Sequence, residues 1–328
     1  MGAFGRNHAR VYHQLAQQGE PVRLVGIVDA DPARADTVAR EFGCRAFGSV
    51  EQLTTTHSEV QAASVAVPTL RHLEVTRALM EAGVDVLVEK PLAASLADAD
   101  ELIRIAKDLG RIGQVGHLER FNPAVRATAT LITQPMFFEV HRLSIFTPRS
   151  LDVDVVLDLM IHDLDVVLSF VNSPVTEIRA VGLPILSGKA DIANVRLEFE
   201  SGCVANFTAS RVSTERVRKI RFFQPRQYVS LDYSRQDVLV FSVGEGQIRG
   251  TPSVNPQIKV AKIPIVAEEP LQAELRSFLD SVRTRSQPLV SFEDGRRALA
   301  LALDIAAAIR EHSSKVQLDR LNGSVPNS

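Results

Sequence analysis

The chain of 328 residues is poor in cysteine, in net charge and in long apolar runs, and each shortage excludes a class of protein. Cys44 and Cys203 are its two cysteines, too few for a disulfide framework or a CxxC metal pair, which fits a reducing cytoplasm. With a net charge of -2, the chain has no excess of basic residues of the kind that binds nucleic acid, so no nucleic-acid partner is expected. Charges interrupt every apolar stretch before about 18 residues, and no secretory signal is visible, so neither a membrane span nor export is expected.

The first part of the chain alternates helical and strand patterns. Apolar, largely β-branched runs typical of buried strands stand at 22–28, 60–67 and 84–88, and a shorter one at 112–115. Helical stretches lie between them, and several end at a glycine. Strands separated by single helices form βαβ units, so we predict a doubly wound, parallel α/β domain of the Rossmann type over residues 1–121.

The second part of the chain has a different pattern. A long apolar helix is predicted at 154–171, and seven strand-like runs then follow one another without helices between them. Consecutive strands favour an open, mainly antiparallel sheet with one face free for packing. Helical patterns return at 268–285 and 292–312. We therefore predict a second, α+β domain at 122–318 and a loose tail at 319–328.

Two glycines and an acid match parts of a dinucleotide-binding motif. Gly2 and Gly5 open a helix, where backbone N–H groups and the helix dipole favour a pyrophosphate, although an ordinary turn also explains them. Asp29 ends the 22–28 strand, roughly 20 residues further on, where an acid binds the ribose hydroxyls. Because a carboxylate repels a 2′-phosphate, NAD is predicted rather than NADP. Arg34 could lie over the adenine or be a solvated helix residue.

Lys90 follows a buried strand run that ends at Glu89. Ligands of open α/β sheets bind outside the carboxyl ends of the strands, and Val67 and Pro68 end the preceding strand. Lys90 is therefore predicted to point into the crevice beside the cofactor. The alternative is a surface lysine paired with Glu89.

Asp158 and His162 stand four residues apart on the predicted long helix, so they share a helix face. Histidine is the natural proton acceptor at neutral pH, and a nearby carboxylate stabilises the imidazolium. A helix-packing pair is the alternative. No metal site is predicted, because Asp165 lies off that face and no Cys/His cluster accompanies it.

Five elements, in order, resemble those of the Gfo/Idh/MocA oxidoreductases: Gly2-Ala3-Phe4-Gly5, Asp29, Glu89-Lys90-Pro91, Gly116-His117 and Asp158-x-x-x-His162. The resemblance covers nearly the whole chain. It implies a Rossmann domain, a C-terminal domain on an open antiparallel sheet, and homo-oligomers, dimers or tetramers, formed through that sheet. It also implies that Lys90 orients the substrate hydroxyl and the nicotinamide ribose, and that His162, assisted by Asp158, is the acid/base.

By the same resemblance, the expected cofactor contacts are Gly2, Phe4, Gly5, Asp29, Arg34, Val67, Pro68, His72, Glu89 and Lys90. Segments 116–123 and 158–165 are similar to the branch of the family that oxidises the 3-hydroxyl of UDP-N-acetylglucosamine-type sugars. The predicted function is thus NAD-dependent hydride transfer from a sugar secondary hydroxyl, with the sugar bound between the domains. The expected substrate contacts are His117, Glu119, Arg120, Asn122, Arg142 and Arg149.

Some alternatives stay open at this point. The three arginines offer planar forks for a diphosphate, but each is also an ordinary surface residue. An inositol or free-sugar dehydrogenase of the same family would carry the same motifs. A non-catalytic NAD-binding regulator is the alternative from another class.

The glycine loop of the family reads Gly-x-Gly-x-x-Gly after a strand, whereas Met1 stands here immediately before Gly2. The first glycine and the first strand therefore do not appear in the sequence. In the strand order 3-2-1-4-5-6 that strand is central, so we expect strands 22–28 and 60–67 to be unpaired from each other. Either the gene start is misplaced, which we favour, or the sheet is gapped and NAD binding is impaired.

Overall fold

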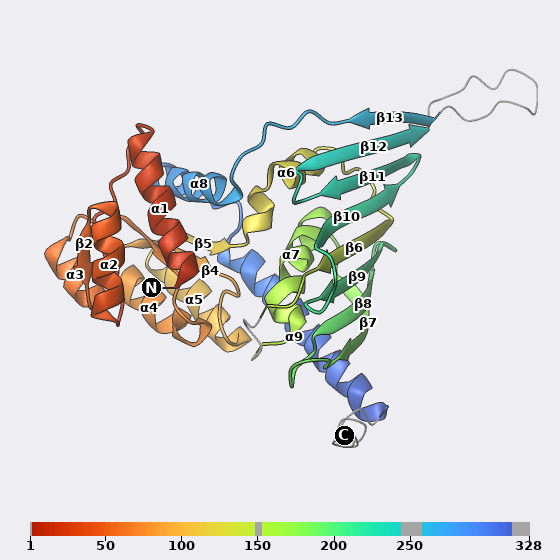
Figure 1. Ribbon diagram of the computed structural model, residues 1–328, viewed down its shortest axis with the longest axis horizontal. Helices are drawn as coiled ribbons and strands as arrows, with labels where there is room; N and C mark the ends of the chain where they lie inside the picture. Colours follow the sequence, from red (N-terminus) through yellow and green to blue (C-terminus); the bar gives the residue numbers. More distant parts are fainter. Residues whose placement is uncertain (1, 148–152, 244–257, 317–328) are drawn as a thin grey trace, which may run out of the picture. The chain divides into compact units, whose positions relative to one another are not determined.

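A computed structural model of the protein describes residues 2–147, 153–243 and 258–316. The chain divides into two compact units (Figure 1): unit 1 takes its residues from 1–121 and 268–299, and unit 2 from 122–267 and 300–328. The first segment of unit 1 ends at Phe121, and unit 2 begins at Asn122. Residues 268–299 differ from the prediction, because they pack in unit 1 rather than in the second domain.

Unit 1 alternates strands and helices along the chain. Its helices are α1 (Ala3–Gln17), α2 (Pro32–Phe42), α3 (Val50–Thr56), α4 (His72–Glu81), α5 (Leu96–Asp108) and α8 (Pro270–Thr284), with 3-10 turns η1 (Thr69–Arg71) and η2 (Leu118–Phe121). Its strands are β1 (Gly26–Val28), β2 (Arg45–Phe47), β3 (Ala62–Val65), β4 (Asp85–Glu89) and β5 (Gly113–Gly116). Every strand pair of this unit is parallel, which confirms the predicted doubly wound α/β class.

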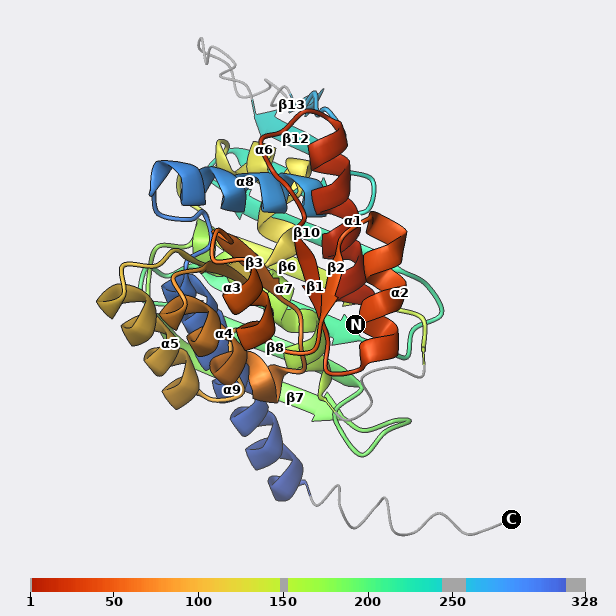
Figure 2. The same ribbon diagram turned by 90° about the vertical axis from the view of Figure 1, so that its left-hand side faces the viewer.

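The strands of unit 1 form two separate sheets. β1 pairs with β2, and β3, β4 and β5 form a second sheet in that order. Within the described ranges no ladder joins β1 to β3, which confirms the expectation that these two strands are unpaired from each other. The ladder of β1 covers only three residues, although the apolar run begins at Val22, because its partner β2 is equally short. Figure 2 shows this pair beside α1 and α2.

Local signals explain the helices of unit 1. The Asp31 carboxylate accepts hydrogen bonds from the backbone N–H groups of Ala33 and Arg34 and so caps α2, which begins with Pro32. Gly43 ends the same helix at φ 67°, a conformation that favours glycine. α8 belongs to this unit because Leu275 and Phe278 share a buried cluster with Val11 of α1 and Leu87 of β4.

Unit 2 is built on one eight-stranded sheet in the order β13-β12-β11-β10-β6-β9-β8-β7. These strands are β6 (Phe137–Leu143), β7 (Val175–Leu183), β8 (Ile192–Phe199), β9 (Val204–Ser210), β10 (Val217–Gln224), β11 (Gln227–Asp232), β12 (Asp237–Val243) and β13 (Ile258–Lys262). The pairs are antiparallel except β6 with β9, which is parallel. The predicted open, mainly antiparallel sheet is thereby confirmed.

The helices of unit 2 lie against one face of this sheet. They are α6 (Pro123–Ala129), the π-helical turn η3 (Val156–Met160), α7 (Ile161–Phe170) and the part of α9 (Phe292–Lys315) after residue 299. The Phe138 ring of β6 stacks on Phe170 of α7 with centroids 6.4 Å apart. An added Cβ at Gly182 of β7 would lie 2.8 Å from Ile309 of α9, so the strand and this helix are in close contact. In the described part of the chain no helix is long and apolar enough to cross a membrane.

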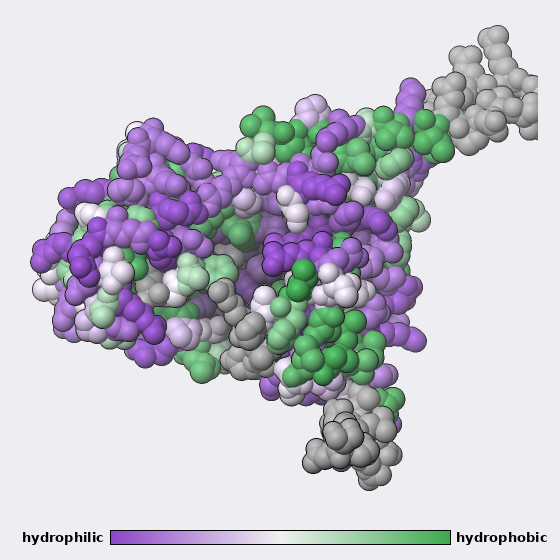
Figure 3. All heavy atoms as spheres, viewed as in Figure 1, coloured by the Kyte–Doolittle hydropathy of each residue, from purple (hydrophilic) through white to green (hydrophobic). Residues whose placement is uncertain are grey.

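The opposite face of the sheet carries a row of aromatic rings. Phe137, Phe223, Tyr228 and Phe241 follow one another across four strands, with centroid separations of 5.7, 4.8 and 5.0 Å. Phe223 is 39% exposed. Figure 3 shows that hydrophobic side chains continue along β13, where Ile258 and Val260 are exposed.

Candidate functional site

The first turn of α1 offers backbone donors to an anion. Gly2 is its N-cap and supplies no side-chain hydrogen bond, and the first turn contains no acidic residue. Among the described residues, an added Cβ at Gly2 would meet nothing within 4 Å. Gly5 is buried in the first turn, whereas the Phe4 ring is 60% exposed. Free N–H groups and the helix dipole at such an end favour a phosphate.

Asp29 follows β1 directly, at the carboxyl end of the strand. Its Oδ1 accepts a hydrogen bond from the backbone N–H of Asp31, 2.8 Å away, which fixes the carboxylate at the start of the loop. Arg34 lies one turn into α2 and pairs with Asp31 at 3.0 Å, with its side chain 66% exposed. Because its side chain is exposed and forms an ion pair with Asp31, the N-cap of the same helix, Arg34 has the environment of a surface residue.

His72 joins the ends of two neighbouring strands. Its Nε2 lies 3.0 Å from the carbonyl oxygen of Val67, and its Nδ1 lies 3.0 Å from that of Pro91. Burial lowers the pKa of His72, whereas the contacts of its ring nitrogens with carbonyl oxygens act in the opposite direction. The structure thus places His72 as a tie between the Val67-Pro68 loop and the Lys90-Pro91 peptide, which is cis.

The Glu89 side chain at the end of β4 is fixed by contacts within unit 1. Its Oε1 lies 2.8 Å from His8 Nε2, so the carboxylate faces α1. Lys90 follows immediately, beyond the carboxyl end of the strand, as predicted from the run before it. An added Cβ at Gly116 of β5 would lie 3.2 Å from the Glu89 carboxyl carbon, so any larger residue there would require Glu89 to shift.

The predicted substrate residues after β5 are mostly buried. His117 and Glu119 are 1% and 8% exposed, and Arg120 donates a hydrogen bond from Nη2 to the Leu289 carbonyl oxygen at 3.3 Å. In unit 2, Asn122 caps α6 by accepting from the N–H of Ala124 at 3.0 Å. The amide nitrogen of Asn122 donates to the Tyr233 carbonyl oxygen at 3.0 Å. Both the oxygen and the nitrogen of this side chain therefore form hydrogen bonds to the backbone of unit 2.

Asp158 and His162 lie across the junction between η3 and α7. The N–H of Ile161 bonds to the carbonyl oxygen of Val156, so the chain makes π-helical rather than α-helical turns at Asp158. A π turn widens the helix and re-aims the side chains along it, and such turns are frequent at functional sites. Asp158 lies in this π turn, and His162 is the second residue of α7. Both side chains are half-buried.

Arg142 is placed differently from the prediction. Its guanidinium donates from Nε and Nη2 to the two carboxylate oxygens of Asp163, at 2.6 and 2.9 Å. The two side chains are 4% and 2% exposed, and the Tyr233 ring lies 5.2 Å from Arg142 Cζ. Because the planar fork of Arg142 holds Asp163, the arginine is a buried structural partner in this structure and not a surface fork for a diphosphate. Arg149 lies outside the described residues.

Three features of these sites escaped the sequence analysis. The π turn has no sequence signature, and the Arg142–Asp163 pair joins two elements whose contact no spacing predicts. The third feature is a group of His8, Glu89 and Glu274, whose potential ligand atoms lie within 4.8 Å of one another. A glutamate at 274 between the buried Ala273 and Leu275 is the one visible signal, since it falls on the buried face of an amphipathic helix.

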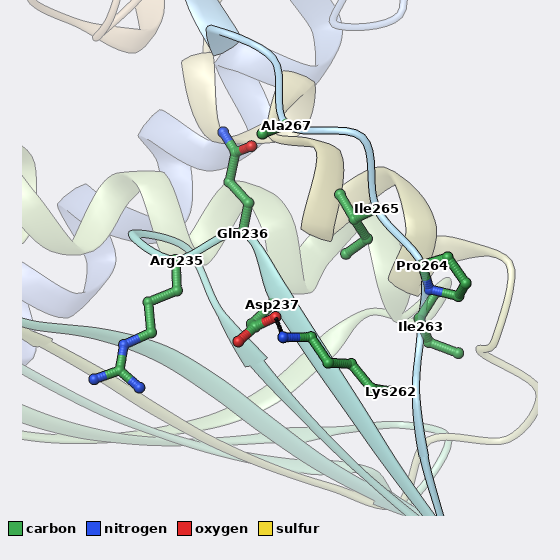
Figure 4. A pocket seen from close by; sticks show the side chains of 8 residues that line it. All are labelled: Arg235, Gln236, Asp237, Lys262, Ile263, Pro264, Ile265 and Ala267. Carbon is green, nitrogen blue, oxygen red and sulfur yellow. Dashed lines mark ion pairs between the residues drawn. The ribbon is translucent and has the colours of Figure 1, made fainter.

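A hollow of about 420 Å³ also lies in unit 2. Figure 4 shows its lining: Arg235, Gln236, Asp237, Lys262, Ile263, Pro264, Ile265 and Ala267. Asp237 Oδ1 and Lys262 Nζ form an ion pair across it at 2.5 Å. None of the predicted site residues lines this hollow.

A doubly wound unit with an open helix N-terminus and an acid after a strand defines a Rossmann-type dinucleotide-binding protein. Comparison with known families is consistent with this class. The model described as "Oxidoreductase family, NAD-binding Rossmann fold" matches residues 1–117, and the "GFO/IDH/MocA C-terminal domain" matches residues 104–226. The chain belongs to the Gfo/Idh/MocA family of oxidoreductases, and its cofactor is NAD.

Several relatives extend over almost the whole chain. A UDP-N-acetylglucosamine 3-dehydrogenase of Acidithiobacillus ferrooxidans is 36% identical over 94% of this chain and 95% of its own length. A solved structure of UDP-N-acetylglucosamine 3-dehydrogenase from that organism has a TM-score of 0.84 and 34% identity, and covers 94% of this chain and 95% of its own. An inositol 2-dehydrogenase of Rhizobium meliloti is 24% identical over 97% of this chain and 96% of its own length.

Proposed function

We propose that the protein is an NAD-dependent dehydrogenase that oxidises the 3-hydroxyl of a UDP-N-acetylglucosamine-type nucleotide sugar to a 3-keto sugar. The observation that supports this substrate is the 36% identity, over 94% of the chain, to a UDP-N-acetylglucosamine 3-dehydrogenase. The inositol 2-dehydrogenase at 24% identity supports a polyol as the second candidate less strongly.

The residues of unit 1 fit the cofactor. In this proposal the pyrophosphate is bound by the N–H groups at the start of α1, above Gly2, where no described residue would contact an added Cβ and the first turn holds no acidic side chain. Asp29 accepts hydrogen bonds from the ribose hydroxyls, as its place after β1 requires. His72 keeps the Val67-Pro68 loop and the Lys90-Pro91 peptide in register at the strand ends.

The proposed chemistry removes a hydride from the sugar carbon and a proton from its hydroxyl, leaving a carbonyl. NAD, when bound, supplies the hydride acceptor. His162 takes the hydroxyl proton on its imidazole, and Asp158 stabilises the imidazolium that forms. Lys90 donates a hydrogen bond to the same oxygen and stabilises the negative charge that develops on it.

We also propose that the protein forms homo-oligomers through the face of the sheet in unit 2 that carries the aromatic row. The row of Phe137, Phe223, Tyr228 and Phe241 on that face supports this, since aromatic residues are enriched in protein interfaces.

The proposed location is the cytoplasm, because Cys44 and Cys203 are both free thiols, as a reducing compartment maintains.

A substrate screen tests the proposed function. Purified protein is incubated with NAD and, separately, with UDP-N-acetylglucosamine, myo-inositol and free N-acetylglucosamine, and NADH formation is followed. We expect NADH with the UDP-sugar, and a loss of roughly 10²–10⁴-fold in turnover for Lys90→Ala and for His162→Ala. Undiminished turnover in both variants would exclude the assigned roles, and NADH from inositol alone would favour the second candidate. NAD binding without turnover of any sugar would indicate a regulator.

A further inference from the structure

Three polar side chains from distant parts of the sequence meet inside unit 1. His8 comes from α1, Glu89 from the end of β4 and Glu274 from α8. His8 Nε2 lies 2.8 Å from Glu89 Oε1, and one atom of each of the three side chains lies within 4.8 Å of the others. The side chains of His8 and Glu89 are 2% and 14% exposed, and Glu274 is fully buried.

Glu274 is chemically unusual in this environment. Among the described residues, neither carboxylate oxygen of Glu274 has a hydrogen-bond partner, and neither does His8 Nδ1. A buried carboxylate without donors is strongly disfavoured, and a second carboxylate beside it adds repulsion. Burial first and the charge of Glu89 second raise the pKa of Glu274 well above its usual value. A carboxyl group in these surroundings is favoured as the neutral acid.

Other groups around Glu274 do not supply a neutralising charge. On α1, the guanidinium of Arg10 pairs with Glu269, and the Tyr12 hydroxyl lies 2.9 Å from Ser64 Oγ. Burial raises the pKa of Tyr12, and Glu274 contributes in the same direction, so the phenol stays neutral. The turn η2, which also packs against α8, carries Glu119 and Arg120. Of the charged groups that face Glu274, Glu89 is the one that perturbs it.

We infer that Glu274 is a neutral acid in the folded protein, and that His8 and Glu274 are positioning residues for the strand end that presents Lys90. His8 hydrogen-bonds to Glu89 from α1, and the neutral Glu274 side chain lies beside the same carboxylate on α8 without adding a second negative charge. Gly116 of β5 has no side chain and leaves room for the Glu89 carboxyl group. The half of this inference that concerns Lys90 rests on the proposed function, whereas the protonation of Glu274 does not.

The first test is the pH dependence of the melting temperature, measured without any substrate. An acid whose folded pKa is raised stabilises the fold fully below its unfolded pKa, near 4.3, and this stability is lost as pH rises through the folded pKa. Glu274→Gln mimics the neutral acid and cannot ionise. We therefore expect the variant to melt progressively higher than wild type, by about 5 °C or more at pH 9, with the gap closing towards about pH 5. Glu81→Gln on the exposed surface of α4 is the matched control and should follow wild type at every pH.

The second test is the split between kcat and KM in the sugar oxidation. Glu274→Ala removes one support of Glu89 and should lower kcat by about 10–100-fold through misplacement of Lys90, with little change in the KM for NAD. Glu274→Gln should restore kcat to within about threefold of wild type, because it keeps the size and the neutrality of the protonated acid. If Glu274→Ala does not fold, Glu274→Met, which is closer in size, takes its place.

Each outcome decides a part of the inference. Parallel melting curves for wild type and Glu274→Gln would mean that Glu274 is ionised in the fold and would overturn its assignment as a neutral acid. Wild-type kcat in Glu274→Ala would overturn the positioning role. A stoichiometric divalent cation in the purified protein, lost in His8→Ala, would make the group a metal site instead. If no sugar is oxidised at all, the proposed function fails while the melting test still judges the protonation of Glu274.

Discussion

The buried ion pair of Arg142 and Asp163 permits a stability prediction with a definite size. Two charge-assisted hydrogen bonds of 2.6 and 2.9 Å join the guanidinium and the carboxylate, and both side chains are almost completely buried. Asp163→Asn keeps the shape but leaves the guanidinium buried beside a neutral amide. Breaking such a pair from one side costs about 3–5 kcal/mol. At roughly 2–4 °C per kcal/mol, the melting temperature should fall by about 6–20 °C.

Two further variants separate the charge from the general effect of mutation. Arg142→Met combined with Asp163→Leu removes both charges and should recover much of the loss, since hydrophobic pairs replace buried ion pairs well. Glu139→Gln is the control on the same strand, β6: its partner Arg221 lies 3.0 Å away, and both side chains are more than one third exposed. This exposed pair should contribute less than about 1 kcal/mol. Thermal unfolding followed by circular dichroism measures all three, and an Asp163→Asn variant that melts like Glu139→Gln would refute the reasoning.

Three other outcomes follow from the packing and the charges. Gly295→Ala should lower the melting temperature, because the added Cβ would lie 2.5 Å from Val115 Cγ2 and such overpacking costs about 1–3 kcal/mol. Gly188→Ala is the control: its added Cβ would meet no described atom within 4 Å, so the melting temperature should not change. Asp29→Ala should weaken NAD binding by about 10–100-fold in calorimetry, and an unchanged affinity would remove Asp29 from the cofactor site. Phe223→Glu should lower the molar mass found by light scattering if the aromatic face joins protomers, and an unchanged oligomer would contradict that role.

Much of the fold could be predicted because its signals are local. The alternation of apolar runs and glycine-ended helices gave the doubly wound class, and Asp31, Pro32 and Gly43 mark the ends of α2 by side-chain and backbone chemistry. The strand lengths were less accurate. The length of a strand depends on hydrogen bonding to its neighbour. The apolar run that begins at Val22 therefore forms a strand only at Gly26–Val28, where β2 pairs with it.

The side-chain environments of the site were predicted less well, because they depend on contacts between distant elements. The residues next to Arg142 in the sequence do not show which side chain its guanidinium contacts. Its spacing of two and four residues from the buried Val140 and Phe138 does place it on the covered face, and that alternation was the available signal. The proximity of Glu274 of helix α8 to Glu89 of strand β4 has no comparable local sign.

The proposed reaction is tested most directly by following the hydrogen that leaves the sugar. UDP-N-acetylglucosamine deuterated at C3 is incubated with the protein and NAD, and both products are analysed by mass spectrometry. The proposal predicts that the deuterium appears in the reduced cofactor and that the sugar loses one deuterium and one proton, giving a 3-keto product. Reduced cofactor without deuterium, or a sugar product that keeps its label, would contradict oxidation at the 3-hydroxyl.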